Sequence, residues 1–268
     1  MLDENRKHYV TASQAHRIMA GFESELIDIP KPHFEESDLV LCHLHDCTNK
    51  PKVGELKSAG LMATGAQISS CWEYHKSLTP VFTTGMESVA REIAMAQFLD
   101  ERDEQYQSED MERGNIQERE AIIALSEHLG VEFFDTEDDQ TFFTKGSLGV
   151  TPDGVQYDSD FNVEACGEVK NPKDTSHMYY LLMINSQDDL LRLKPEYYWQ
   201  AQAGLAVTGA KSYHWASYHN GFRMPYRLVY VHITPNLEHI RALEIRAARV
   251  AARVPEIVDW IKRLFSRA

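Results

Sequence analysis

The chain of 268 residues has no run of about 18 consecutive apolar residues, which is roughly the length that a membrane-spanning helix requires. Its N-terminal stretch, MLDENRKHYV, lacks the apolar core of a secretory signal peptide. These two absences predict a cytoplasmic protein that does not associate with a membrane.

Cysteine is scarce, and the cysteines present are not arranged as paired CxxC motifs. The four are Cys42, Cys47, Cys71 and Cys166. This spacing indicates neither a disulfide framework nor a four-thiolate cluster. We therefore expect reduced thiols.

Basic residues are also scarce relative to acidic ones. Lysine and arginine together number 27 against 41 aspartates and glutamates, which gives a formal net charge of −14. A protein that coats nucleic acid indiscriminately is excluded, because most of this surface would repel the phosphate backbone. A local basic track is compatible with the same composition.

Length and composition favour one domain with an insertion. A hydrophobic content of 43% over this length supports a substantial core. Between residues 22 and 80 prolines and glycines interrupt any regular pattern, and we interpret this segment as an insertion or lid within a single domain spanning 1–268.

The stretch from 148 to 170 predicts a β-hairpin that carries reactive side chains. Residues 158–162, DSDFN, are rich in turn formers, and apolar and polar residues alternate after them. This period of two places Glu168 and Lys170 on one face of the second strand, while Asp153 lies in a Pro-Asp-Gly turn at the start of the first. Such a group suits a hard divalent cation with a water beside it, although a surface salt-bridge cluster explains the same residues.

Two predicted helices add polar groups that point inward. On the helix 113–129, Glu118 precedes the apolar stripe of Ile122 and Leu125 on the same face, where a carboxylate is costly unless a positive charge meets it. An acid that interacts with the helix dipole is the alternative. On the helix from Pro195 to Val207, Gln200 shares a face with apolar residues, and a bond from its side chain to backbone is the alternative there.

The two ends of the chain are basic. A capping box of Thr11 and Gln14 begins a helix just after Arg6, a combination that suits a phosphate, although a solvated basic start is the simpler interpretation. Strands are predicted at 212–220 and 226–234. The helical segment 236–265 carries Arg241, Arg246, Arg249 and Arg253, for which we expect an exposed basic face, with a face turned toward DNA as the alternative. Pro255 predicts a break or a new helix start.

Four blocks of sequence then coincide with one known family. They are VTASQAHRIMAG, RGNIQEREA, the pair VTPDG and GEVKNP, and YYWQAQAGLAVTGAKSYHWASY. With these four blocks in this order, the chain resembles the phage lambda exonuclease and YqaJ-type viral recombinase nucleases, members of the PD-(D/E)XK superfamily. The resemblance implies an α/β fold with a restriction-endonuclease-like core, in which helices flank a central mixed β-sheet.

The resemblance also implies a role for each matching residue. Glu118, Asp153 and Glu168 correspond to the metal-binding carboxylates, and the main-chain carbonyl of Val169 is a further ligand. Lys170 corresponds to the lysine that positions or deprotonates the attacking water.

The remaining implied roles concern the following helix and the DNA end. Gln200 corresponds to the glutamine that completes the catalytic motif. Ser13, together with Arg6, corresponds to the pair that receives the 5′-phosphate of the degraded strand. The segment 22–80 and the spacing between Asp153 and Glu168 are both longer than in the lambda-type enzyme.

The implied activity is that of a Mg²⁺-dependent 5′→3′ exonuclease that degrades one strand of linear double-stranded DNA. Two Mg²⁺ ions per site are implied, with Mn²⁺ as a substitute, and the 3′ single-stranded tails would serve a phage annealing protein. The family implies a homo-oligomer, a ring-shaped trimer, encoded by a phage or prophage in a bacterial host cell.

Other functions on the same residues stay open. A structure-specific or Cas4-like endonuclease would use the same core, although the Cas4-type cysteine cluster is absent from the sequence. A non-catalytic DNA-end-binding or recombinase-loading module is disfavoured by the presence of all three carboxylates and the lysine. A protein-binding inhibitor or decoy built on the fold is supported only by the long insertion.

Overall fold

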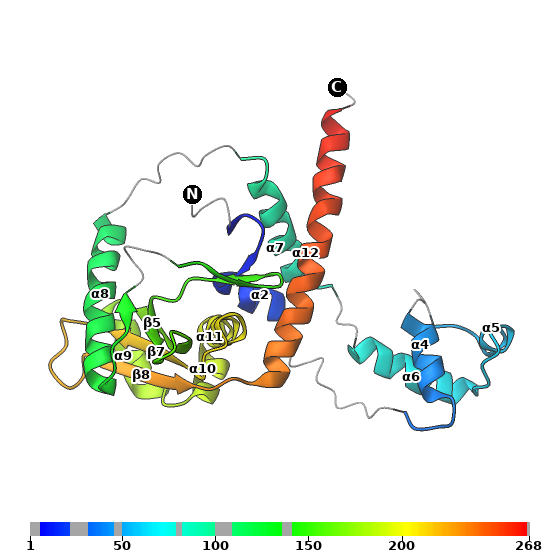
Figure 1. The fold of residues 1–268 in the computed structure, drawn as a ribbon, viewed down its shortest axis with the longest axis horizontal. Helices are drawn as coiled ribbons and strands as arrows, with labels where there is room; N and C mark the ends of the chain where they lie inside the picture. The colour runs from blue at the N-terminus through cyan, green and yellow to red at the C-terminus, as the bar shows by residue number, and fades with distance from the viewer. Residues whose placement is uncertain are drawn as a thin grey trace. The chain divides into compact units, whose positions relative to one another are not determined.

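The computed structural model describes residues 6–21, 32–45, 50–78, 82–99, 109–135 and 141–266. The chain divides into two compact units, one made of residues 1–19 and 84–268 and the other of residues 20–83 (Figure 1). Within the described ranges, no helix is both long and apolar enough to cross a membrane.

The smaller unit is more regular than its prolines and glycines predict. It contains the helices α4 (Ser37–His45), α5 (Val53–Ser58) and α6 (Gly65–Leu78). The helices form although prolines and glycines interrupt the pattern: Pro51 precedes α5 and Gly60 follows it with a φ of 79°, whereas Gly54 lies within α5 and Gly65 begins α6. A small apolar core of its own holds the unit together, formed by Val40, Leu44, Leu56, Ala63, Ile68 and Cys71.

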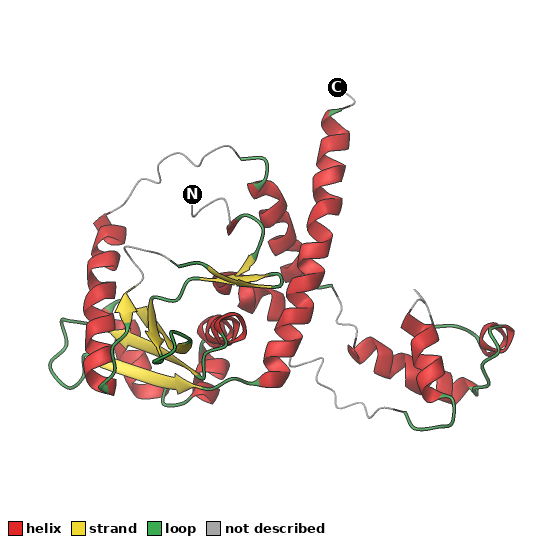
Figure 2. Cartoon of the chain, in the orientation of Figure 1, coloured by secondary structure: helices red, strands yellow, loops and turns green. Residues whose placement is uncertain are grey.

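The larger unit is built around a five-stranded mixed sheet in the order β2-β5-β6-β7-β8 (Figure 2). The strands are β2 (Phe134–Asp135), β5 (Gly154–Tyr157), β6 (Val163–Lys170), β7 (Ser212–Tyr218) and β8 (Leu228–Ile233). The pair β6 and β7 is parallel and the other pairs are antiparallel. The predicted α/β fold with a mixed sheet flanked by helices is confirmed.

The predicted hairpin is the antiparallel pair of β5 and β6. Its turn closes with a bond from the Asp158 N–H to the Asn162 carbonyl at 2.9 Å. The side chain of Asp158 also accepts the main-chain N–H groups of Asp160 and Asn162, each at 2.9 Å. The turn chemistry read from the sequence therefore sets the hairpin that carries Asp153 and Glu168.

Two helices cover opposite faces of β6. Helix α8 (Glu109–Leu129) packs Ile122 and Leu125 into one apolar cluster with Ala165 and Val169. The intervening residue Cys166 instead contacts α11 (Pro195–Thr208), through Thr208. Because side chains alternate along a strand, Glu168 and Lys170 also face α11.

A second, three-stranded sheet connects the N-terminal residues to the strand that leads to Asp153. It has the order β1-β4-β3, made of β1 (Val10–Thr11), β4 (Leu148–Val150) and β3 (Phe143–Lys145). Val10 pairs in parallel with Leu148, and the predicted capping box of Thr11 and Gln14 starts the short helices η1 (Ala12–Gln14) and α2 (Ala15–Met19).

The remaining helices of this unit are α7 (Thr84–Ala96), α9 (Asp174–Met183), α10 (Gln187–Leu193) and α12 (Leu237–Phe265). Two predictions for α12 are wrong. The helix runs through Pro255, because buried Val254 and Val258 anchor it on both sides of the missing N–H. Arg246 does not lie on an exposed face: it is 1% exposed and donates to the carbonyl of Ile18 at 2.6 Å.

Candidate active site

Glu168 is the centre of a hydrogen-bonded cluster at the end of β6. Its side chain is buried, with the residue only 3% exposed. The Oε1 atom accepts hydrogen bonds from the Lys170 ammonium and from the Gln200 side-chain amide, and Oε2 accepts from the Tyr213 hydroxyl at 3.1 Å. Three elements, β6, α11 and β7, thus fix the orientation of one carboxylate.

Asp153 is tied to the same strand from the β5 side. Its main-chain N–H donates to the Gly167 carbonyl at 3.0 Å, and its carboxylate Oδ2 accepts the Val169 N–H at 2.8 Å. The N–H and carbonyl of a strand residue point to the same side, so the Val169 carbonyl also faces the side of Asp153. Two carboxylates and this carbonyl therefore surround the end of β6.

The electrostatics of the cluster show a shortage of positive charge. Burial raises the pKa of Asp153 well above its ordinary value, and the negative charges of Glu168 and Glu118 raise it further, against the opposing effect of Lys170. Glu118, on the first half of α8, therefore acts on the same site. A divalent cation would relieve this repulsion among three carboxylates.

Lys170 is held as an ammonium ion. Burial alone would lower its pKa, but Glu168 and Asp153 outweigh that effect and raise the pKa above its ordinary value. In the arrangement described, Lys170 is consequently a hydrogen-bond donor and a positive charge rather than a base.

Tyr213 is a part of the site that the sequence did not single out. The residue is 2% exposed, and burial together with the charge of Glu168 raises the pKa of its phenol well above the ordinary value, so the hydroxyl stays protonated and donates. A Cβ atom added at Gly204 would meet the Tyr213 ring at 2.2 Å. Glycine at this position lets the ring pack against α11, but no pattern in the sequence marks this contact.

The donor set fits a hard cation, although the structure does not present a ready-made group. Within the described residues, no three histidine, cysteine, aspartate or glutamate side chains are arranged so that they could hold a metal ion. A carboxylate offers about four lone-pair positions, and the bonds to Lys170, Gln200 and Tyr213 use three of those on Glu168. Carboxylate and carbonyl oxygens are what Mg²⁺ prefers, and this ion keeps several waters, so few protein ligands are needed.

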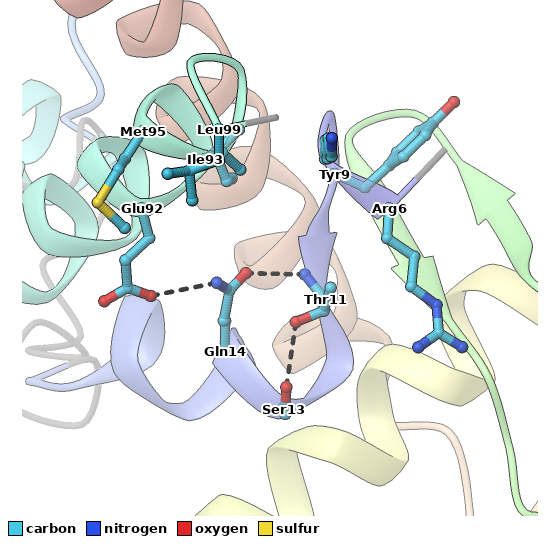
Figure 3. A pocket seen from close by; sticks show the side chains of 11 residues that line it. Arg6, Tyr9, Thr11, Ser13, Gln14, Glu92, Ile93, Met95 and Leu99 are labelled. Carbon is cyan, nitrogen blue, oxygen red and sulfur yellow. Dashed lines mark hydrogen bonds between the residues drawn. The ribbon is translucent and has the colours of Figure 1, made fainter. Parts of the chain in front are cut away.

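The predicted phosphate-binding residues line a separate cavity of about 460 Å³ (Figure 3). Ser13 lies in its wall, with its Oγ 3.1 Å from the Thr11 hydroxyl. Arg6 lies in the same wall and donates to the Thr151 hydroxyl at 2.8 Å, two residues before Asp153. The cavity is thus joined to the carboxylate cluster through β4 and the residues that follow it.

One acidic side chain, Glu92, also lines this cavity. Its two carboxylate oxygens each accept a bond from Arg17 at 2.7 Å, and these bonds to Arg17 lower the pKa of Glu92. Gln14 donates to it as well, at 3.3 Å (Figure 3). Because Arg17 offsets its charge, Glu92 does not cancel the positive charges of Arg6 and Lys7 around the cavity.

The structure therefore brings the predicted residues together in two groups. Glu168 is hydrogen-bonded to Lys170 and to Gln200, and Asp153 accepts the N–H of Val169, the residue between Glu168 and Lys170. Glu118 is near enough for its charge to act on Asp153. The other group, Arg6 and Ser13, lies at the N-terminal cavity.

Residues 56–211 match the model of the YqaJ-like viral recombinase domain, more than half of the chain. The chain belongs to this family. The match includes every candidate residue from Glu118 to Gln200 and lies C-terminal to Arg6 and Ser13. No curated protein sequence shows a significant match to the chain.

Solved structures give the same fold. An alkaline exonuclease from Laribacter hongkongensis, LHK-Exo, is 16% identical with a TM-score of 0.57, over 98% of this chain and 96% of the other. Its complex with dAMP is 17% identical, with a TM-score of 0.55 and the same coverage. A phage-related exonuclease from Haemophilus somnus is 12% identical with a TM-score of 0.56, over 97% of this chain and 100% of the other. The predicted family and the predicted nuclease fold are confirmed.

Proposed function

We propose that this chain is a Mg²⁺-dependent 5′→3′ exonuclease that degrades one strand of linear double-stranded DNA. The observation that carries the proposal is the hydrogen-bonded group of Glu168, Lys170 and Gln200 at the end of β6, with Asp153 bound to the N–H of Val169 and the charge of Glu118 acting on Asp153. Similarity to structures named as exonucleases supports the reaction, and family membership supports a role in phage recombination.

In this proposal Glu118, Asp153, Glu168 and the Val169 carbonyl hold the divalent metal, as one or two Mg²⁺ ions with Mn²⁺ as a substitute. Bound there, the metal would lower the pKa of the attacking water and offset negative charge on the scissile phosphate. The chain's own residues do the positioning. Gln200 and Tyr213 fix the plane of the Glu168 carboxylate, so its oxygens are oriented before the substrate arrives.

Lys170 orients the water and stabilises charge that develops on the phosphoryl oxygens. Its ammonium already donates to Glu168, so it reaches the region where the metal and phosphate would meet. As long as no metal is bound, Glu168 and Asp153 raise the pKa of Lys170 and keep it an ammonium ion. Burial of the cluster strengthens each of these interactions.

Arg6 and Ser13 receive the 5′-phosphate of the strand being degraded. The guanidinium of Arg6 suits a phosphate, and its bond to Thr151 joins the cavity to the residues that lead to Asp153. A 5′-phosphate held there would place the next phosphodiester toward the carboxylate cluster. This arrangement supports the proposed polarity and the release of nucleotides from 5′ ends, which leaves 3′ single-stranded tails for an annealing protein.

The proposal extends to the assembly. We propose a homo-oligomer, which by resemblance to the family is a ring trimer and would keep the enzyme on its DNA. The unit of residues 20–83 would be an insertion in a single nuclease domain, where it serves as a lid or a partner-binding surface. Sedimentation of the protein with and without residues 22–80 tests the oligomeric state and whether this segment contributes to it.

The test of the activity uses linear duplexes labelled at either the 5′ or the 3′ end, with and without a 5′-phosphate and Mg²⁺. We expect early release of the 5′ label, only with Mg²⁺, and faster from phosphorylated ends. The Lys170→Ala variant should be inactive but folded, while Lys211→Ala, which removes an exposed lysine paired with Glu164, should be fully active.

Three results would contradict parts of this proposal. Normal digestion by Lys170→Ala removes that residue from the site. Unchanged preference for phosphorylated ends in Arg6→Gln and Ser13→Ala rejects the phosphate-binding cavity. Cleavage of covalently closed circular DNA favours an endonuclease over an exonuclease.

A further inference from the structure

A second lysine lies beside the proposed active site, in a position that the carboxylate cluster does not explain. The Lys194 ammonium is 5.9 Å from the centre of the Tyr197 ring, and the Lys170 ammonium is 5.8 Å from the same centre. One aromatic ring thus contacts both cations. Lys194 is therefore placed next to the lysine that is proposed to meet the scissile phosphate.

The aromatic surroundings of Lys194 are rigid. Its ammonium is also 5.7 Å from the centre of the Tyr180 ring. Tyr197 stacks on Trp215, which is fully buried, with ring centres 5.4 Å apart, and Tyr180 meets the same Trp215 edge-on at 5.5 Å. Rings that are packed in this way hold a cation in place without neutralising it.

The main chain of Lys194 is fixed as well. The residue ends α10 and caps α11: its N–H donates to the Leu190 carbonyl at 2.8 Å, and its carbonyl accepts the Tyr197 N–H at 3.0 Å. Its side chain is 30% exposed, so the ammonium is ordered yet reachable. An ordered cation loses little conformational entropy when it binds an anion.

Lysine is a poor choice for this position on grounds of helix stability. Helices favour serine, threonine, aspartate or asparagine at the N-cap, and a cation there opposes the helix dipole. Lys194 makes no side-chain capping bond, and Glu196 offsets its charge only in part, at 3.4 Å. A local preference broken in this way is expected where function requires the residue.

A cavity of about 330 Å³ lies in front of this lysine. Its lining combines Lys194 with the hydroxyl-bearing side chains of Thr175, Ser176, Tyr179 and Tyr180. Hydroxyl donors and one ammonium are suited to a phosphodiester oxygen. The cavity belongs to the start of α9, only a few residues after Lys170 in the chain.

We propose that Lys194 binds a backbone phosphate of the DNA, the one on the 3′ side of the scissile phosphate. This inference rests on the proposed function, in which Arg6 and Ser13 hold the 5′-phosphate near Asp153 and the strand leaves past Lys170. Lys194 then sets the register of the strand, and Tyr197 separates the two lysines so that each faces its own phosphate.

The experiment compares the salt dependence of duplex binding for the wild type, Lys194→Gln and Lys211→Gln. Binding of a fluorescent 5′-phosphorylated duplex is followed by anisotropy, with Ca²⁺ in place of Mg²⁺. Lys211 is a matched control because it is an exposed lysine that is paired with Glu164 and lies away from the proposed site. It lies just before the start of β7, whereas Lys170 is opposite Ser217, near the other end of that strand. Unfolding midpoints for all three proteins show that each is folded.

Loss of one phosphate contact has a defined size. The slope of log K against log salt should fall by about 0.9, which weakens binding roughly eightfold at about 0.1 M salt. Lys211→Gln should change neither quantity. The wild type should lose the same factor when a neutral methylphosphonate replaces the phosphate on the 3′ side, and Lys194→Gln should lose nothing more from that replacement.

Equal slopes of log K against log salt for the wild type and Lys194→Gln would overturn the inference. An equal loss of affinity in Lys211→Gln would do the same, as would a methylphosphonate effect in Lys194→Gln as large as in the wild type. The binding assay needs no hydrolysis. If the wild type binds with the predicted Lys194 dependence but does not digest DNA with Mg²⁺, the proposed function fails while the phosphate contact stands. If it digests DNA and Lys194→Gln binds normally, only this inference fails.

Discussion

Tyr213→Phe removes a single oxygen atom from the support of Glu168. In the native protein the buried Tyr213 hydroxyl donates to the Glu168 Oε2 atom at 3.1 Å. Phenylalanine fills the same space, so the ring contact with Gly204 is kept. The variant therefore isolates the hydrogen bond from the packing of the ring.

The expected magnitude follows from the charge of the acceptor and from its burial. A hydrogen bond to a charged group contributes about 1.5–3 kcal/mol to stability, and a buried acceptor left without its donor loses all of that. Residues that orient metal ligands typically change metal affinity or activity by about 10–100-fold when they are replaced. We expect a lower free energy of unfolding and a Mg²⁺ activation curve shifted to higher concentration by such a factor.

The assay is digestion of a 5′-phosphorylated linear duplex over a range of Mg²⁺ concentrations, with urea unfolding measured on the same preparations. Tyr198→Phe is the matched control, since Tyr198 is equally buried but its hydroxyl meets His239 Nδ1 at 2.8 Å, away from the carboxylates. A hydrogen bond between two side chains of this kind contributes about 0.5–1.5 kcal/mol, so the control should be slightly less stable with unchanged Mg²⁺ dependence. Identical Mg²⁺ curves for Tyr213→Phe and the wild type would refute the role given to Tyr213.

Three further predictions concern charge and packing. The pKa of Asp153 is raised in the folded state, so the protonated carboxyl group favours folding at low pH. This contribution to the free energy of unfolding is lost as pH rises from about 4, the ordinary pKa of an aspartate, through the raised pKa of the folded state. Asp153→Asn should therefore melt at a higher temperature than the wild type at neutral pH without metal, and Mg²⁺ should stabilise only the wild type; a lower melting temperature would contradict this. Gly204→Ala should lose about 1–3 kcal/mol in urea unfolding because its Cβ meets the Tyr213 ring at 2.2 Å, whereas Gly54→Ala, with nothing within 4 Å, should lose none. Arg246→Met removes a buried bond to a main-chain carbonyl of α2 and should lower the free energy of unfolding by about 1.5–3 kcal/mol, an effect that an unchanged urea midpoint would exclude.

The hairpin and α11 were predictable from local patterns. Turn formers at 158–162 and a period of two after them define β5 and β6, and with them the neighbours Asp153 and Glu168. Pro195 begins α11 as predicted, and Gly209, at a φ of 71°, ends the helix after Thr208, one residue beyond the predicted end at Val207. Both signals act over short distances in the chain, which is why the sequence contains them.

The contribution of Tyr213 was not predictable in this way. It depends on the parallel pairing of β6 with β7. The register of this pair places Glu168 opposite Trp215, two residues after Tyr213. Three helices separate these strands in the chain, and no periodicity encodes the register of strands so far apart. The intervening α10 was also not predicted, although Ser186 caps it by accepting the Asp189 N–H.

Arg246 shows a signal that was present but misread. The spacing of arginines along α12 is typical of a solvent-exposed face. Yet Arg246 lies between Leu243 and Val250 on the stripe that the structure buries. A positive side chain within an apolar stripe predicts a buried partner, and the carbonyl of Ile18 fills that role.

The central claim is that Asp153, Glu168 and Lys170 form a metal-dependent nuclease site. The most direct measurement is digestion of a 5′-phosphorylated linear duplex by the wild type and by Asp153→Asn, each with Mg²⁺ and with EDTA, after both are shown to be folded. We expect digestion by the wild type only with Mg²⁺ and none by Asp153→Asn. Digestion by the wild type in EDTA, or by Asp153→Asn at the wild-type rate, would contradict it.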